Sequence, residues 1–153
     1  MTTAGDGAAA GRSRAVATWL ALIGGSIGLH RFYLHGVRDG WAWLHPWPTL
    51  LGGYGFWRLR EFGVDDERGS FLVLLLGVML AMSMLQAIVY GLTSDERWAR
   101  RHGPAVPPRG PAWPTFVAVG LALAIGASVA MATIAFAAQR YFESPAATAS
   151  AIR

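Results

Sequence analysis

Residues 71–92, FLVLLLGVMLAMSMLQAIVYGL, form an apolar run of 22 residues without a charged side chain. A transmembrane helix needs about 20 mostly apolar residues, because each residue advances the helix by about 1.5 Å and the hydrocarbon layer is about 30 Å thick. A second uncharged run of 24 residues covers residues 115–138. Both runs therefore predict membrane-spanning helices.

The composition agrees with this interpretation. Hydrophobic residues make up 54% and charged residues 14% of the 153 residues, whereas a soluble domain is about 45–50% apolar and about 25% charged. All 13 basic residues are arginines in short segments between apolar runs. This distribution is typical of the flanks of membrane helices and not of the basic stripe that binds nucleic acid. We therefore expect the lipid bilayer, and no nucleic acid, as a partner.

Two further apolar stretches lie in the first half of the chain. Residues 15–29, AVATWLALIGGSIGL, reach a membrane-crossing length only if the helix continues to Leu34. Residues 41–57, WAWLHPWPTLLGGYGFW, contain Pro46 and Pro48, which predict a kink. We expect these stretches to form a tight helical hairpin; the alternative is a re-entrant or interfacial second segment. The predicted fold is an all-α integral membrane protein with about four transmembrane helices.

The chain then divides into four parts. Residues 1–11 and 144–153 are expected to be disordered tails, residues 12–63 the hairpin, and residues 64–143 a second pair of membrane helices. The link inside the second pair ends in a proline-rich stretch, which predicts extended backbone. Before it, residues 94–102 predict a short amphipathic helix capped by Thr93 or Ser94.

Two glycine-containing blocks stand out in the hairpin, GSIGLHRFYL at residues 25–34 and GGYGFWRLRE at residues 52–61. They resemble the TM-two domain family, whose pattern is G-x-x-G-x-H-R-F-Y-L-G at the end of the first helix and G-G-x-G-[IF]-W-x-[LI]-x-[DE] at the end of the second. The matching positions are Gly25, Gly28, His30, Arg31, Phe32, Tyr33, Leu34, Gly52, Gly53, Gly55, Trp57 and Glu61. His35 departs from the family glycine, and Arg58 and Arg60 stand where apolar residues are common. The resemblance implies little about activity, since most members have no known molecular function.

These residue types also suit a membrane hairpin without the resemblance. Glycines allow helix backbones to approach closely in lipid. His30 and Arg31 would lie at the turn, where Arg31 could pair with a lipid phosphate, with Asp39 or with a helix-end carbonyl. Phe32 and Tyr33 suit an aromatic belt at the membrane surface. We interpret HRFY as a structural turn, with a binding site for a lipid or a partner peptide as the alternative.

Small residues recur every four positions in the last apolar run. One row comprises Ala118, Ala122, Gly126 and Ala130, and a parallel row comprises Gly120, Ala124, Ser128 and Ala132. Such rows mark close helix packing in membranes. The row predicts packing against the protein's own residues 71–92; the alternative is docking onto another membrane protein or a second copy.

The sequence favours a non-enzymatic scaffold or accessory subunit in the cytoplasmic membrane of a bacterium, crossing it several times. No nucleotide-binding loop, serine-hydrolase elbow or zinc-protease motif occurs, and we expect no catalytic residue, cofactor or metal. One alternative is a haem- or metal-binding membrane subunit that uses His30, His35 or His45, since imidazole is a common metal ligand. Another is a small transporter or channel, which the absence of charge within the last two runs disfavours.

Overall fold

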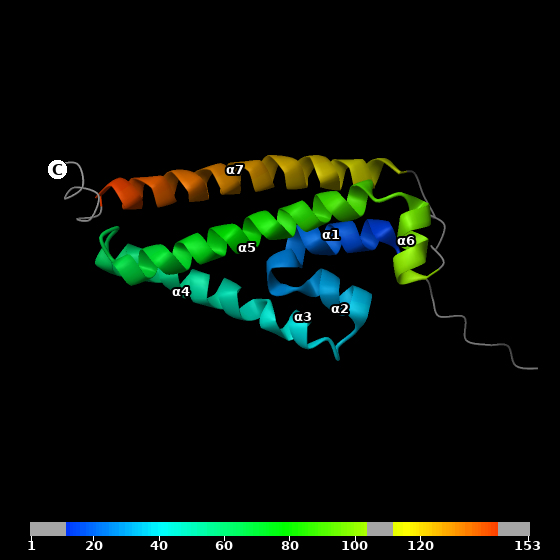
Figure 1. The fold of residues 1–153 in the computed structure, drawn as a ribbon, viewed down its shortest axis with the longest axis horizontal. Coiled ribbons are helices and arrows are strands. Elements are labelled where there is room, and N and C mark those ends of the chain that lie inside the picture. The colour runs from blue at the N-terminus through cyan, green and yellow to red at the C-terminus, as the bar shows by residue number, and fades with distance from the viewer. Residues whose placement is uncertain (1–11, 104–111, 144–153) are drawn as a thin grey trace, which may run out of the picture.

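The computed structural model describes residues 12–103 and 112–143, which form helices joined by short turns (Figure 1). Residues 1–11, 104–111 and 144–153 lie outside the described residues, and with them both expected tails and most of the proline-rich link. In chain order the helices are α1 (Arg14–Gly24), the 3-10 turn η1 (Gly25–Ile27), α2 (Leu29–His35), α3 (Gly40–Leu44), α4 (Pro46–Phe62), α5 (Glu67–Leu92), α6 (Asp95–His102) and α7 (Trp113–Glu143).

The two long helices contain the two long apolar runs. Residues 71–92 lie within α5 and residues 115–138 within α7, and both helices are long and apolar enough to cross a membrane. They run antiparallel and in contact, because Gly126 of α7 faces Met84 and Gly77 of α5 faces Thr133. The prediction of a helix over each run is confirmed.

The first apolar stretch departs from the expected single helix through Leu34. The chain leaves α1 through η1 and then bends at Gly28, whose φ is +82°. Glycine reaches this left-handed region without the steric cost that a Cβ imposes. After the bend α2 returns toward the start of α1, where the hydroxyl of Tyr33 accepts a hydrogen bond of 2.8 Å from the backbone N–H of Ser13. The stretch is therefore a broken helix that reverses direction.

The second stretch is interrupted where the prolines predict it. Asp39 caps α3 by accepting a hydrogen bond from the N–H of Trp41, and α3 ends before His45. Pro46 then begins α4, in a first-turn position where a helix tolerates a residue without an N–H. The helix is thus interrupted at His45, next to the prolines, and its backbone stays helical there.

The two stretches meet, but not as a hairpin of two helices packed side by side. The 3-10 turn η1 and α2 contact α3 and the start of α4: the hydroxyl of Thr49 donates a hydrogen bond of 2.6 Å to the carbonyl of Ser26. In Figure 1, α1 and α4 lie end to end along α5 rather than side by side. Gly25, at the end of α1, lies against Ser83 near the middle of α5, while Gly52 of α4 lies against Leu76. The glycines do allow close approach of helices, but most of them pack against α5.

Helix α6 covers the end of the bundle at which α1 begins. It starts after the cap Ser94, as predicted, and buries the indole of Trp98 to 1% exposure. The indole N–H donates a hydrogen bond of 2.7 Å to the carbonyl of Arg12. The start of α1 and the link after α5 are thereby held together.

Candidate functional site

His30 lies in α2, directly after the bend at Gly28. Its imidazole is deeply buried, with a residue exposure of 1%. Its ring centroid lies 5.9 Å from that of His45 and 5.8 Å from that of Tyr90. The side chain of Gln86 lies beside the imidazole as its polar neighbour within the bundle. Buried polar groups in folded proteins are usually paired with one another in this way. This cluster is therefore the candidate site.

The second histidine of the cluster is oriented by its own helix. The Nδ1 of His45 lies 2.8 Å from the carbonyl oxygen of Trp41, one turn earlier. A carbonyl oxygen only accepts, so Nδ1 donates this hydrogen bond. The rings of His30 and His45 lie nearly perpendicular across the turn.

The arginine of the motif takes one of its three predicted partners. Arg31 donates from Nε and Nη2 to one carboxylate oxygen of Asp39, at 3.1 and 3.0 Å. Burial opposes the charge on this carboxylate, but the hydrogen bonds from Arg31 and from the N–H of Trp41 outweigh it and lower the pKa of Asp39. The pair therefore stays charged at neutral pH and closes the loop between α2 and α3.

The remaining residues of HRFYL hold the returning helix. Phe32 packs edge to face on Trp43 with ring centroids 5.4 Å apart, and the carbonyl of Tyr33 accepts a hydrogen bond from Arg12. Leu34 is 2% exposed and packs with Ala17 and Trp98. These contacts agree with a structural role for the motif.

The motif glycines divide by what they face. A Cβ at Gly28 would lie 2.9 Å from the Cβ of His45, and one at Gly25, Gly52 or Gly55 would collide with α5, whereas Gly53 faces open space. At the far end of α4, Trp57 stacks on Tyr54 and Glu61 is exposed. Most of the motif glycines thus allow close packing against α5 or His45. The motif residues at the end of α4 lie at the surface.

The predicted packing row of α7 is largely internal. Ala118, Ala122 and Gly126 are buried, and Ala130 is half-buried. The parallel row, Gly120, Ala124, Ser128 and Ala132, is exposed. One row therefore packs on the chain itself and the other is available on the outer face.

Sequence reasoning missed three residues around the cluster. Gln86 is a strongly polar side chain within the apolar run of residues 71–92, but the sequence does not show that it lies beside His30. Tyr90 and Trp98, whose rings lie 5.8 Å apart, contact this region only because the chain reverses at Gly28. No local sequence pattern predicts that contact.

Comparison with known proteins identifies the first part of the chain. Residues 10–62, about a third of the chain, match the family model described as TM2 domain. Searches of curated proteins and of solved structures each gave no match. The matched segment contains α1 to α4 and every motif residue discussed above. Residues 10–62 of the chain are therefore similar to the TM2 domain.

Proposed function

We propose that the chain is a non-enzymatic, multi-pass protein of a bacterial cytoplasmic membrane that acts as a scaffold or accessory subunit through helix packing. The observation that carries this proposal is the exposed row of small residues on α7, opposite the row that packs on α5. In lipid, small residues favour association because they let backbones approach closely. The occupant we propose is a transmembrane helix of another membrane protein.

The proposed arrangement has three crossings, formed by α3–α4, α5 and α7, and a re-entrant α1–η1–α2. Four full crossings would put the start of α1 and helix α6 on opposite surfaces. The hydrogen bond from Trp98 to Arg12 and the 3.4 Å ion pair between Arg14 and Asp95 support a common surface instead. Gly25 lies against Ser83, so the re-entrant segment would reach the middle of the apolar run of α5.

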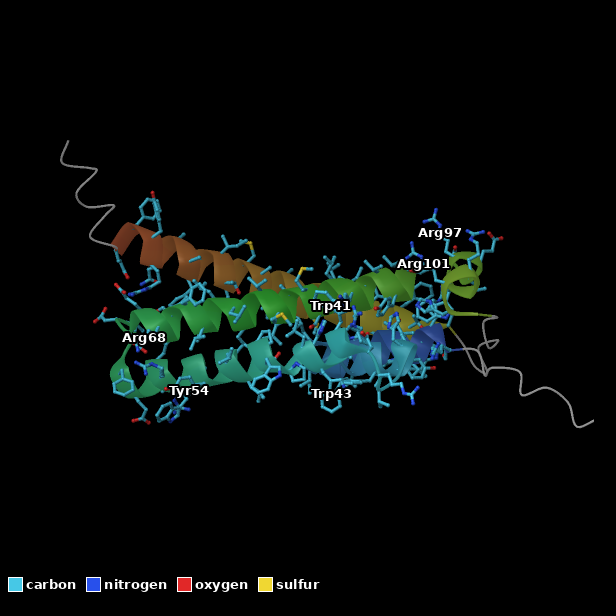
Figure 2. All side chains as sticks on the ribbon, turned by 60° about the horizontal axis from the view of Figure 1, so that its bottom comes forward. Trp41, Trp43, Tyr54, Arg68, Arg97 and Arg101 are labelled. Carbon is cyan, nitrogen blue, oxygen red and sulfur yellow. The ribbon has the colours of Figure 1, made fainter. Side chains whose placement is uncertain are left out.

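This arrangement favours one orientation. Figure 2 shows Arg97 and Arg101 at the α6 end of the bundle and Arg68 at the other end. Among the described residues, the α6 surface then has seven arginines and the opposite surface four: Arg12, Arg14, Arg31, Arg38, Arg97, Arg100 and Arg101 against Arg58, Arg60, Arg68 and Arg140. Because cytoplasmic loops carry an excess of basic residues, the α6 surface would be cytoplasmic.

Single cysteines test the arrangement, because the native chain contains none. Ser13→Cys, Val37→Cys and Val64→Cys would be labelled in whole cells with an impermeant maleimide. We expect Ser13 and Val37 to be protected and Val64 to react. Four crossings would group Ser13 with Val64 against Val37, and a re-entrant second stretch would group Val37 with Val64 against Ser13.

A pull-down tests the scaffold role itself. The chain, expressed at native level, would be purified from membranes in mild detergent and its companions identified by mass spectrometry. Ala124→Leu fills the exposed row and should remove a stoichiometric companion. Gly53→Leu adds a side chain at an open position of another helix, α4, and should keep it. A companion retained by both variants, or none with the native chain, would contradict the proposal.

A further inference from the structure

A cavity of about 610 Å³ lies at the end of the bundle where α5 begins and α7 ends (Figure 1). The charged part of its lining comes from the turn before α5, the first residue of α5 and the last turn of α7, and comprises Asp65, Glu67, Arg140 and Glu143. The apolar part includes Phe71 and Leu74, about one and two turns into α5. The cavity is therefore amphipathic, and two helices far apart in the sequence form it together.

The lining places the cavity at the depth of lipid headgroups. Phe71 is the first residue of the uncharged run of residues 71–92, and the uncharged run within α7 ends at Ala138. The charged lining residues lie just outside both runs. Because a headgroup layer flanks the hydrocarbon core of a bilayer, they would face headgroups, while Phe71 and Leu74 would face the first carbons of the acyl chains.

The charged side chains are only loosely engaged with the protein. Arg140 lies 3.9 Å from Glu143, which is too far for a hydrogen bond, and Glu143 accepts a hydrogen bond of 2.9 Å from Gln139. Within residues 12–103 and 112–143, the carboxylates of Asp65 and Glu67 accept no hydrogen bond and form no ion pair. The guanidinium and these two carboxylates therefore have capacity for a ligand.

The distribution of charge indicates what kind of ligand fits. In the part of the chain that the structure describes, no three acidic, histidine or cysteine side chains gather closely enough to hold a metal ion. The cavity instead offers both signs of charge at separate points of its lining. A guanidinium pairs well with a phosphate, and carboxylates accept hydrogen bonds from an ammonium group. An extended zwitterion with an apolar tail matches this pattern.

We propose that this cavity binds a phospholipid whose headgroup carries a phosphate and a primary ammonium. Arg140 contacts the phosphate, while Asp65 and Glu67 accept hydrogen bonds from the ammonium. The acyl chains begin against Phe71 and Leu74. A primary ammonium has three N–H donors, whereas a quaternary ammonium has none, and a headgroup without a cation would be repelled by the carboxylates.

Native mass spectrometry of the full chain tests the site. The chain, delipidated in detergent, would be titrated with phosphatidylethanolamine, phosphatidylcholine or phosphatidylglycerol carrying the same acyl chains. We expect one phosphatidylethanolamine per chain, bound at least fivefold more tightly than the other two lipids. Arg140→Gln and Glu67→Gln should each weaken this binding at least threefold. Arg60→Gln and Glu96→Gln, which neutralise exposed charges outside the cavity, should not.

A third variant separates the cavity from surface charge. Leu74→Trp keeps every charge and fills the apolar part, so it should also weaken binding at least threefold. Far-UV circular dichroism shows whether this variant folds, and Arg140→Gln, at a partly exposed side chain, tests the site if it does not.

Three results would overturn the proposal. The first is equal affinity for phosphatidylcholine or phosphatidylglycerol, which would show that the ammonium donors are not recognised. The second is native affinity in Arg140→Gln or in folded Leu74→Trp, which would place the lipid elsewhere. The third is displacement of the lipid by an equal concentration of glycerophosphoethanolamine, which would make the free headgroup the ligand. None of these results depends on the exposed row of α7, so they leave the pull-down of Ala124→Leu as a separate test.

Discussion

Two adjacent glycines on α4 allow the packing of this helix on α5 to be measured directly. Gly52 and Gly53 stand in the same helix, but only Gly52 faces α5. A Cβ at Gly52 would lie 2.3 Å from the Cβ and 3.0 Å from the Cα of Leu76, whereas a Cβ at Gly53 would have no atom within 4 Å. Carbon atoms in contact normally lie about 3.5–4.0 Å apart, so Gly52→Ala requires the helices to separate.

The expected magnitudes follow from two effects. Gly→Ala in a helix interior gains about 1 kcal/mol of helix stability at either position. Overpacking costs about 1–3 kcal/mol, and we expect the upper end at Gly52 because the collision includes the backbone of α5. Gly53→Ala should therefore raise the free energy of unfolding by about 1 kcal/mol, and Gly52→Ala should lower it by about 1–2 kcal/mol. Helix propensity cancels in the comparison, which isolates the packing effect.

Reversible unfolding of both variants in mixed micelles with increasing SDS, followed by tryptophan fluorescence, measures this difference. Far-UV circular dichroism of the folded variants controls for altered helix content. If Gly52→Ala is as stable as Gly53→Ala, α4 does not pack on α5 through Gly52, and the end-to-end arrangement of α1 and α4 is refuted.

Three further substitutions test other parts of the structure. Gly28→Ala should lower the free energy of unfolding in SDS, because φ is +82° at Gly28 and a Cβ there would lie 2.9 Å from the Cβ of His45; a neutral Gly28→Ala would contradict the tight turn. Trp98→Ala should cost about 3–5 kcal/mol of unfolding free energy, with Trp98→Phe intermediate, because the alanine loses the buried ring and both lose the hydrogen bond to Arg12; a neutral Trp98→Ala would show that α6 is not anchored. The hydrogen bonds from Arg58 lower the pKa of Asp66 despite opposing desolvation, so its carboxylate stabilises the fold above the unfolded pKa, and this is lost as the pH falls below about 4. Asp66→Asn should lose less stability on acidification of detergent-solubilised protein, and an unchanged acid profile would contradict the ion pair.

The apolar runs and the caps were predictable because their signals are local. The run at residues 71–92 predicted α5, Pro46 predicted the break between α3 and α4, and Ser94 predicted the start of α6. The proline break and the cap depend on residues within about one or two helical turns, and the run on its own 22 consecutive residues.

The tertiary partners of the glycines were not predictable in this way. A glycine shows that some backbone approaches closely, but it does not say which one. The glycines of both stretches were expected to bring the two hairpin helices together, whereas Gly25 and Gly52 face α5. The reversal at Gly28 explains the error, because a helix that turns back near the middle of the bundle leaves room for α4 to continue along the same neighbour.

This packing makes a prediction about the TM2 domain as a unit. Because α1 and α4 both use α5 as their main neighbour, residues 1–63 should not resist proteolysis in membranes when expressed alone. Co-expressed with residues 64–153, the same fragment should become resistant and co-purify, since α5 supplies the surfaces that Gly25, Gly52 and Gly55 fit.

A matched pair of variants makes the fragment experiment specific. Gly52→Leu in the first fragment should abolish co-purification, whereas Gly53→Leu, on the face with open space, should not. If residues 1–63 are resistant alone, the hairpin is self-sufficient and the contacts with α5 are secondary. If both leucine variants still co-purify, another surface joins the fragments. The expected result would mean that the TM2-like segment does not fold stably alone and needs a helix from outside it, here α5 of the same chain.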